Sequence, residues 1–198
     1  MAAEAWSAVL VTTTLIGFGL AIWQAVRAEQ LNKRERDLDW PRFRSAASDL
    51  ARSVDRSDFT PEVILALSER GAIVAHLVAR ELRTQVPVVT AAYLGKPDQS
   101  AELPGHEAVR GTKAVLFLPD GIAGFKGRRL LLLDDFVMTG DGLQSVIDAL
   151  LRKGFERTEI RSGAVVATRI SIVSKKGPDY FGRETTGFDF YFPWGRAE

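Results

Sequence analysis

Two adjacent carboxylates, Asp134 and Asp135, followed closely by a Thr-Gly-Asp-Gly turn, are the residues of this chain best suited to chemistry. Adjacent acids suit a sugar diol, a bound cation, or both. A Gly-bearing turn that leads into a helix offers backbone N–H groups and a positive dipole end to a phosphate. The segment from Asp134 to Gly142 therefore predicts a phosphate cradle beside a grip for ribose or metal. A strand that simply ends in an acidic turn is the alternative, since Asp and Gly are common turn residues.

The elements around this segment must place it at the edge of a sheet. Four leucines, Leu130 to Leu133, predict a strand buried on both faces, which is typical of parallel sheets. In open α/β sheets ligands bind just outside the carboxyl ends of strands, so we expect both acids just past the end of this strand. Apolar residues at helical spacing predict a helix behind the turn, ending near Gly154. Its inward positions are Leu143, Val146, Ile147, Leu150 and Leu151.

The preceding part of the chain predicts a parallel βαβ unit. A strand over 63–67, a turn at 68–71, a helix over 72–82 and a second strand over 86–92 follow one another. The same reasoning gives a surface helix over 43–54 and further strands over 113–118 and 164–173.

Residues 94–112 show little periodicity and predict a long loop. A loop of this length inside a compact domain is usually functional. Lys96, His106 and Arg110 could each reach a phosphate from it, and the sequence does not choose among them.

Composition limits the function classes. The 198 residues can form one domain with a full core and a short accessory segment. Lys plus Arg number 26 against 25 Asp plus Glu, for a net charge of +1, which gives no reason to expect nucleic acid. No Cys is present, which excludes disulfides, thiolate metal sites and Cys nucleophiles. With only two His, any metal should be a hard cation held by oxygen.

The amino-terminal run from Ala5 to Val26 has no charged residue and is long enough to cross a bilayer core of about 30 Å as a helix. Trp6 and Trp23 lie near its ends, where interfacial aromatic residues are common. A cleaved signal peptide is the rival interpretation, but the chain lacks a basic segment before the run. We therefore predict a single membrane span.

Basic residues gather directly after this span, namely Arg27, Lys33, Arg34 and Arg36. The positive-inside rule then places the amino terminus outside and the rest of the chain in the cytoplasm. The predicted organisation is a transmembrane anchor over 1–28, a charged linker over 29–40 and a globular domain over 41–198.

The segment from Asp134 to Gly142 closely resembles the phosphoribosyl diphosphate (PRPP) binding motif of type I phosphoribosyltransferases. That motif is an apolar strand, two acids, two apolar residues, a variable position and Thr-Gly. The resemblance implies an α/β fold with a parallel sheet flanked by helices and a small C-terminal hood. It also implies Mg²⁺-dependent transfer of ribose 5-phosphate from PRPP to a purine-like base, with release of pyrophosphate.

The resemblance further implies roles for single residues. Asp134 and Asp135 would be the catalytic acids that hold the ribose hydroxyls and the Mg²⁺ shell. Arg70-Gly71 would receive pyrophosphate, often through a cis peptide in this family, whereas the alternative is a tight turn with Arg70 as a solvated neighbour. The loop over 94–112 would correspond to the family's mobile loop. The 5′-phosphate would be held by the turn residues Met138, Thr139, Gly140, Asp141 and Gly142.

The aromatic tail resembles the ending of 6-oxopurine phosphoribosyltransferases, where a Pro-Asp-aromatic segment and a Phe-Pro-Trp segment form the hood around the base. Tyr180, Phe192 and Trp194 would then bind the base. An aromatic strand that merely packs is the alternative.

Four departures from the family pattern bear on activity. Met138 stands where 6-oxopurine enzymes carry an Asp near the purine N7, and Thr168 stands near the position of a Lys that contacts O6. Gly142 replaces the final Thr of the turn, and Asp141 adds a negative charge beside the phosphate. Met138, Asp141 and Gly142 motivate an alternative, a membrane-tethered sensor that binds PRPP or a nucleotide without transfer. A partner protein that keeps only the fold is a third interpretation.

The expected partners are PRPP, a nucleobase or nucleotide, and membrane lipid. The sequence indicates neither the base nor the pathway, and it leaves a homo-oligomer open.

Overall fold

The computed structural model describes residues 23–24, 27, 37–83, 85–94, 102–111 and 114–197. Its centre is a five-stranded sheet with strand order β2-β1-β6-β7-β8, in which every neighbouring pair is parallel. The strands are β1 (Val63–Ala66), β2 (Val88–Thr90), β6 (Leu130–Val137), β7 (Ile160–Thr168) and β8 (Tyr180–Thr185). The predicted parallel sheet is confirmed, with the leucine-rich strand in the middle.

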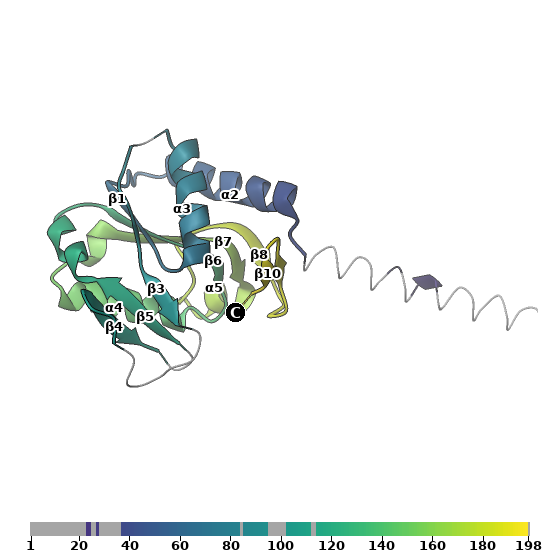
Figure 1. Ribbon diagram of the computed structural model, residues 1–198. Helices are drawn as coiled ribbons and strands as arrows, with labels where there is room; N and C mark the ends of the chain where they lie inside the picture. Colours follow the sequence, from purple (N-terminus) through teal and green to yellow (C-terminus); the bar gives the residue numbers. More distant parts are fainter. Residues whose placement is uncertain are drawn as a thin grey trace, which may run out of the picture.

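Helices cover both faces of this sheet (Figure 1). Helices α2 (Trp40–Asp55) and α3 (Glu69–Glu81) pack on one face, where Phe43, Leu50 and Val74 are buried. Helix α4 (Asp141–Arg152) packs on the other face. Four of its five predicted inward residues are buried, whereas Leu151 is 37% exposed because the helix turns that position toward solvent.

A small antiparallel sheet with strand order β3-β5-β4 stands beside α4 (Figure 1). Its strands are β3 (Ala92–Leu94), β4 (His106–Arg110) and β5 (Val115–Pro119). The predicted loop over 94–112 therefore contains a strand. The sequence does not signal β4, since Val109 is its only buried residue and pairing with the apolar β5 forms it.

Several element boundaries differ from the predictions because polar side chains cap helices. Ser68 accepts a hydrogen bond from the Gly71 amide, so α3 begins at Glu69 and includes the residues predicted as a turn. Thr168 caps a short helix in the same way through the Ser171 amide. The predicted strand over 164–173 is therefore β7 followed by α5 (Arg169–Val173).

The predicted strand over 86–92 is divided between β2 and β3, which belong to different sheets.

The C-terminal segment forms a short hairpin of β9 (Tyr191–Phe192) and β10 (Gly195–Arg196), and the hood that the resemblance implies there stays a prediction. Asp37 makes a parallel bridge to Tyr191, and Leu38 is buried with 3% exposure. Asp39 caps α2 by accepting from the Arg42 amide at 3.0 Å. Residues 37–39, predicted as part of a linker, thus contact the domain, and Leu38 contributes to its core.

Within the described residues, no helix is both long and apolar enough to cross a membrane. The predicted span over 5–26 lies outside those residues, apart from Trp23 and Gln24.

Candidate functional site

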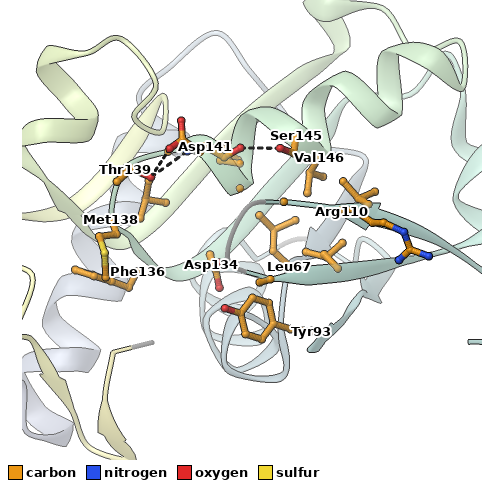
Figure 2. Close-up of a pocket in the computed structure, with 18 residues that line it drawn as sticks. Leu67, Tyr93, Arg110, Asp134, Phe136, Met138, Thr139, Asp141, Ser145 and Val146 are labelled. Carbon is orange, nitrogen blue, oxygen red and sulfur yellow. Dashed lines mark hydrogen bonds between the residues drawn. The ribbon is translucent and has the colours of Figure 1, made fainter. Parts of the chain in front are cut away.

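A pocket of about 660 Å³ opens at the carboxyl end of β6 (Figure 2). Asp134 and the five residues Met138 to Gly142 line it. Tyr93 from β3 and Arg110 from β4 line the pocket from the small antiparallel sheet. The strand, the turn and the small sheet thus bring a carboxylate, a helix N-terminus and a cation around one cavity.

Gly140 sets the shape of the turn. Its φ of 82° and ψ of −4° are left-handed, a conformation that favours glycine. A Cβ built there would lie 2.0 Å from the Lys176 carbonyl oxygen, so the turn and the segment after α5 approach too closely for any side chain. Helix α4 begins at the next residue, and its first N–H groups are unpaired within the helix. The turn is therefore suited to bind an anion.

Asp141 and Thr139 are hydrogen-bonded to each other within this turn (Figure 2). The Thr139 hydroxyl donates to Asp141 Oδ2 at 2.9 Å, and Lys176 Nζ lies 2.7 Å from Asp141 Oδ1. The Asp141 carboxylate does not cap α4, because the capping residue is Gly140, which makes no side-chain hydrogen bond. The Asp141 amide at the start of the helix instead donates to Thr139 Oγ1 at 3.4 Å. The negative charge expected beside the phosphate is therefore paired with a cation that the sequence analysis missed.

Both acids lie within β6, because the strand continues to Val137 rather than ending at Leu133. Asp134 lines the pocket, and its Oδ1 accepts from the Ser68 hydroxyl at 2.9 Å and from the Asp135 amide at 3.0 Å. Asp135 is 7% exposed and does not line the pocket, and its buried Oδ2 has no hydrogen-bond partner among the described residues. Asp134 therefore faces the pocket, whereas the adjacent Asp135 is buried away from it.

Burial raises the pKa of Asp134 well above its ordinary value of 3.8, and the adjacent Asp135 carboxylate raises it further. Burial also raises the pKa of Asp135, although the nearby Arg70 guanidinium acts in the opposite direction. A cation or a donor hydroxyl that enters the pocket would favour the ionised form of Asp134, which is the form that grips a diol.

Arg70 and Gly71 lie in the first turn of α3 and do not line the pocket. A Cβ on Gly71 would lie 2.8 Å from the Leu133 carbonyl oxygen and 3.1 Å from Asp134 Oδ1, so this glycine lets α3 approach β6 closely. Arg70 Nη1 donates to the Arg196 carbonyl at 3.4 Å. No described residue has a cis peptide bond. The assignment of this pair to pyrophosphate stays a prediction.

The three aromatic residues assigned to the base pack on the α2 side of the sheet and do not line the pocket. Phe192 is 4% exposed and stacks on Trp194 at 5.2 Å between ring centroids. Tyr180 donates its hydroxyl hydrogen bond to Ser57 Oγ at 3.0 Å. Phe136 connects the two regions, since it lines the pocket and lies 6.2 Å from the Phe192 ring. Base binding by these residues stays a prediction.

Of the two described loop residues proposed to reach a phosphate, Arg110 lines the pocket and His106 does not. His106 places Nδ1 3.0 Å from the Pro104 carbonyl oxygen, and Lys96 lies outside the described residues. Sequence reasoning missed Ser68 and Lys176. A helix-cap pattern could have indicated Ser68, whereas no local pattern indicates Lys176.

The donor set suits a divalent ion carried in with a substrate. Within the described part of the chain, no three Asp, Glu or His residues gather as a metal cage. Mg²⁺ is usually bound by one or two carboxylates together with substrate phosphates, and Asp134 supplies such a carboxylate at the pocket wall. The residues present fit that mode of binding.

Comparisons with known proteins bear on the whole domain. The family model described as the phosphoribosyl transferase domain matches residues 35–197. No curated protein sequence matches the chain.

Solved structures share the fold at low sequence identity. A purine phosphoribosyltransferase from Pyrococcus horikoshii is 22% identical with a TM-score of 0.58, covering 82% of this chain and 95% of that chain. A hypothetical protein from Neisseria gonorrhoeae with bound ppGpp is 12% identical with a TM-score of 0.59, covering 81% and 89%. The xanthine-guanine-hypoxanthine phosphoribosyltransferase of Helicobacter pylori is 14% identical with a TM-score of 0.56, covering 81% and 93%.

Proposed function

The chain belongs to the phosphoribosyl transferase domain family, and from that premise we propose that it transfers the ribose 5-phosphate of PRPP to a purine-like base. The bond from ribose C1 to a pyrophosphate oxygen breaks. A bond from C1 to a base nitrogen forms as that nitrogen loses its proton. One observation carries the proposal, namely that Asp134 and the turn over 138–142 line the same pocket.

The residues of the pocket act by binding and orienting. The amides at the start of α4, with the Thr139 hydroxyl, hold the 5′-phosphate. Asp134 accepts hydrogen bonds from the ribose hydroxyls once it is ionised, and Ser68 fixes its orientation. Holding both ends of the ribose phosphate aligns C1 with the incoming base and the leaving pyrophosphate. Mg²⁺, when bound with PRPP, supplies positive charge that offsets the charge of pyrophosphate.

The class of base is inferred from the fold neighbours. The Pyrococcus protein is named for purine and the Helicobacter protein for xanthine, guanine and hypoxanthine. An adenine phosphoribosyltransferase from Giardia lamblia has a TM-score of 0.54 at 16% identity. These likenesses support a purine-like base as the class to test first. They do not select one base.

The proposal includes membrane attachment through residues 1–28, with the domain in the cytoplasm. Its support is the uncharged run from Ala5 to Val26 and the basic residues that follow it. PRPP, the substrate that the proposed reaction requires, is a cytosolic metabolite, which agrees with a domain on the cytoplasmic side of the membrane.

A second candidate function is a sensor that binds PRPP or a nucleotide without transfer. The observation that favours it is that the Thr139 hydroxyl donates to Asp141, a carboxylate of the turn itself, which would compete with a phosphate. The Neisseria structure of similar fold is described with bound ppGpp, which supports nucleotide binding as an outcome to test.

One experiment separates the two candidates. Full-length protein is incubated with PRPP, Mg²⁺ and a panel of purine bases, and pyrophosphate release is measured. Release with one base, lost in Asp134→Asn, supports the transferase. Saturable PRPP binding without release with any base selects the sensor, and absence of PRPP binding overturns both candidates.

A further inference from the structure

Lys176 lies beside the phosphate turn although it is 35 residues away from Asp141 in the chain. Its ammonium is 2.7 Å from Asp141 Oδ1, and the Thr139 hydroxyl donates to the other carboxylate oxygen at 2.9 Å. The Asp141 carboxylate thus binds both the Lys176 ammonium and the Thr139 hydroxyl at the edge of the pocket. These two groups are the donors that a phosphate would take.

The backbone of Lys176 is fixed against the turn, whereas its side chain is not. Its carbonyl oxygen lies 2.0 Å from the position that a Cβ of Gly140 would take, and its amide donates to the Ser171 carbonyl at 3.0 Å. Thr168 Oγ1 donates to the Met138 carbonyl and ties α5 to the other end of the turn. The backbone of Lys176 therefore cannot move without the turn, while the four-carbon side chain allows the ammonium to change its partner.

The chain reaches this position through an uncommon backbone conformation. Lys175 has a φ of 60°, in the left-handed region that residues other than glycine rarely adopt. This conformation ends the short helix α5 and brings the next residue onto Gly140. Strained residues of this kind often cluster at ligand sites.

The ion pair is weak enough to exchange. The side chains of Lys176 and Asp141 are 51% and 54% exposed, and exposed ion pairs contribute little to stability. A phosphate dianion carries more charge than a carboxylate and accepts stronger charge-assisted hydrogen bonds. Rotation of Asp141 away from the turn would release both donors at once.

We propose that Lys176 is a phosphate-binding residue of this site and that Asp141 holds it, with the Thr139 hydroxyl, until a ribose 5′-phosphate takes its place. The inference rests on the proposed function, because the same turn must receive the phosphate. In this arrangement the Asp141 carboxylate competes with a 5′-phosphate for the same donors. The affinity for the 5′-phosphate then depends on the exchange of one anion for the other.

The decisive comparison is between the Asp141→Asn variant and the double variant that also carries Lys176→Met. If Lys176 binds phosphate, Lys176→Met in the Asp141→Asn background weakens ribose 5-phosphate binding by about tenfold. If Lys176 only neutralises Asp141, the same change has no effect in that background. Asp141→Asn alone is expected to tighten binding by about fivefold, since it removes the competing anion.

Calorimetric titration of ribose 5-phosphate into the full-length protein and these variants measures the effects. Lys175→Met is the matched control, because it removes the same charge from an exposed neighbouring side chain, and it should change affinity less than twofold. Circular dichroism and thermal unfolding check that each variant is folded. The Lys176 effect should also shrink in high salt.

The outcomes are distinguishable. Equal affinities of Asp141→Asn and the double variant overturn the inference and leave the proposed function standing. An equal loss in Lys175→Met also overturns it, because a general loss of charge would then explain the result. Absence of binding of both ribose 5-phosphate and PRPP to every folded variant overturns the proposed function and the inference together.

Discussion

At the scale of single residues, the two adjacent acids differ more than their shared motif suggests. Asp134 lines the pocket and accepts from Ser68, while Asp135 is buried beside Arg70 with one oxygen unpartnered among the described residues. Adjacent side chains of a strand cannot reach the same point, so one pocket receives only one of them. We therefore assign the proposed ribose contact to Asp134, on which the neighbouring Asp135 carboxylate acts through its charge.

Asp134→Asn should weaken Mg²⁺-dependent PRPP binding at least about tenfold and leave the fold intact, since a hydrogen bond to a charged group contributes about 1.5 to 3 kcal/mol. Asparagine keeps the oxygen that accepts from Ser68 and from the Asp135 amide. Calorimetry measures the affinity and circular dichroism the fold. Unchanged affinity would remove the main support for the proposed ribose contact.

The raised pKa values of Asp134 and Asp135 predict a pH-dependent stability. The folded chain keeps their protons to higher pH than the unfolded chain, so the free energy of unfolding falls as pH rises from about 4 through the raised pKa values. Asp134→Asn should flatten this slope and stabilise the protein at neutral pH. Urea unfolding of both proteins between pH 4.5 and 8 tests this, and parallel pH profiles would contradict it.

Those pKa values also link binding to pH. Because the ionised carboxylate grips the ribose, PRPP binding should release protons and tighten as pH rises through the raised pKa of Asp134. Calorimetry in two buffers of different ionisation enthalpy measures the number of protons released. Asp134→Asn supplies the control, in which the release should fall.

At the scale of elements, the site depends on close approaches between segments that glycine permits. Gly140 brings the turn before α4 onto the segment after α5, and Gly71 brings α3 onto β6. Each approach places a polar group beside the pocket, Lys176 in the first case and Ser68 in the second. The elements therefore position the site through these close backbone approaches as well as through the packing of the core.

Gly140→Ala should lower the free energy of unfolding by about 1 to 3 kcal/mol or more and weaken ribose 5-phosphate binding. The left-handed φ strains any side chain, and the Cβ would collide with the Lys176 carbonyl. Gly142→Ala is the matched control for stability, because nothing lies within 4 Å of its Cβ. It should be neutral or raise stability by about 1 kcal/mol, as alanine favours helices. Equal stabilities of the two variants in urea would contradict the packing argument.

At the scale of the whole molecule, residues just before the predicted boundary at residue 41 contact the domain. Leu38 is buried in the α2 side of the core, and Asp39 caps the helix. The family model begins at residue 35 and so includes these residues. A soluble fragment should therefore keep residues 37–40.

Deleting residues 1–36 should give a folded domain, whereas deleting 1–38 should cost about 2 to 5 kcal/mol of stability, as for removal of a buried leucine side chain. Leu38→Ala in the longer fragment separates the loss of the side chain from the loss of the Asp37 bridge. Urea unfolding compares the three proteins. Equal stability of all three would show that Leu38 contributes nothing to the core.

The predicted anchor is tested on the same scale. Full-length protein should sediment with membranes and require detergent for extraction, while the fragment lacking residues 1–36 should not, because the uncharged run from Ala5 to Val26 is removed. Recovery of the full-length chain in the detergent-free soluble fraction would contradict the anchor.

The sequence alone determined the fold class and the elements that surround the candidate site. A leucine-rich strand, paired acids, a glycine turn and an amphipathic helix are local patterns, and the parallel sheet with α4 behind the turn confirms them. Such patterns can be recognised in the sequence because the periodicity of strands and helices depends on residues that are close together in the chain.

The tertiary structure alone decided which groups meet at the site. Ser68 reaches Asp134 across 66 positions and Lys176 reaches Asp141 across 35, while β4 exists only through its pairing with β5. It also placed Arg70 and the aromatic residues away from the pocket lining. These contacts depend on how strands stack and helices cross, and that geometry is set by the packing of the whole core rather than by residues near each site in sequence.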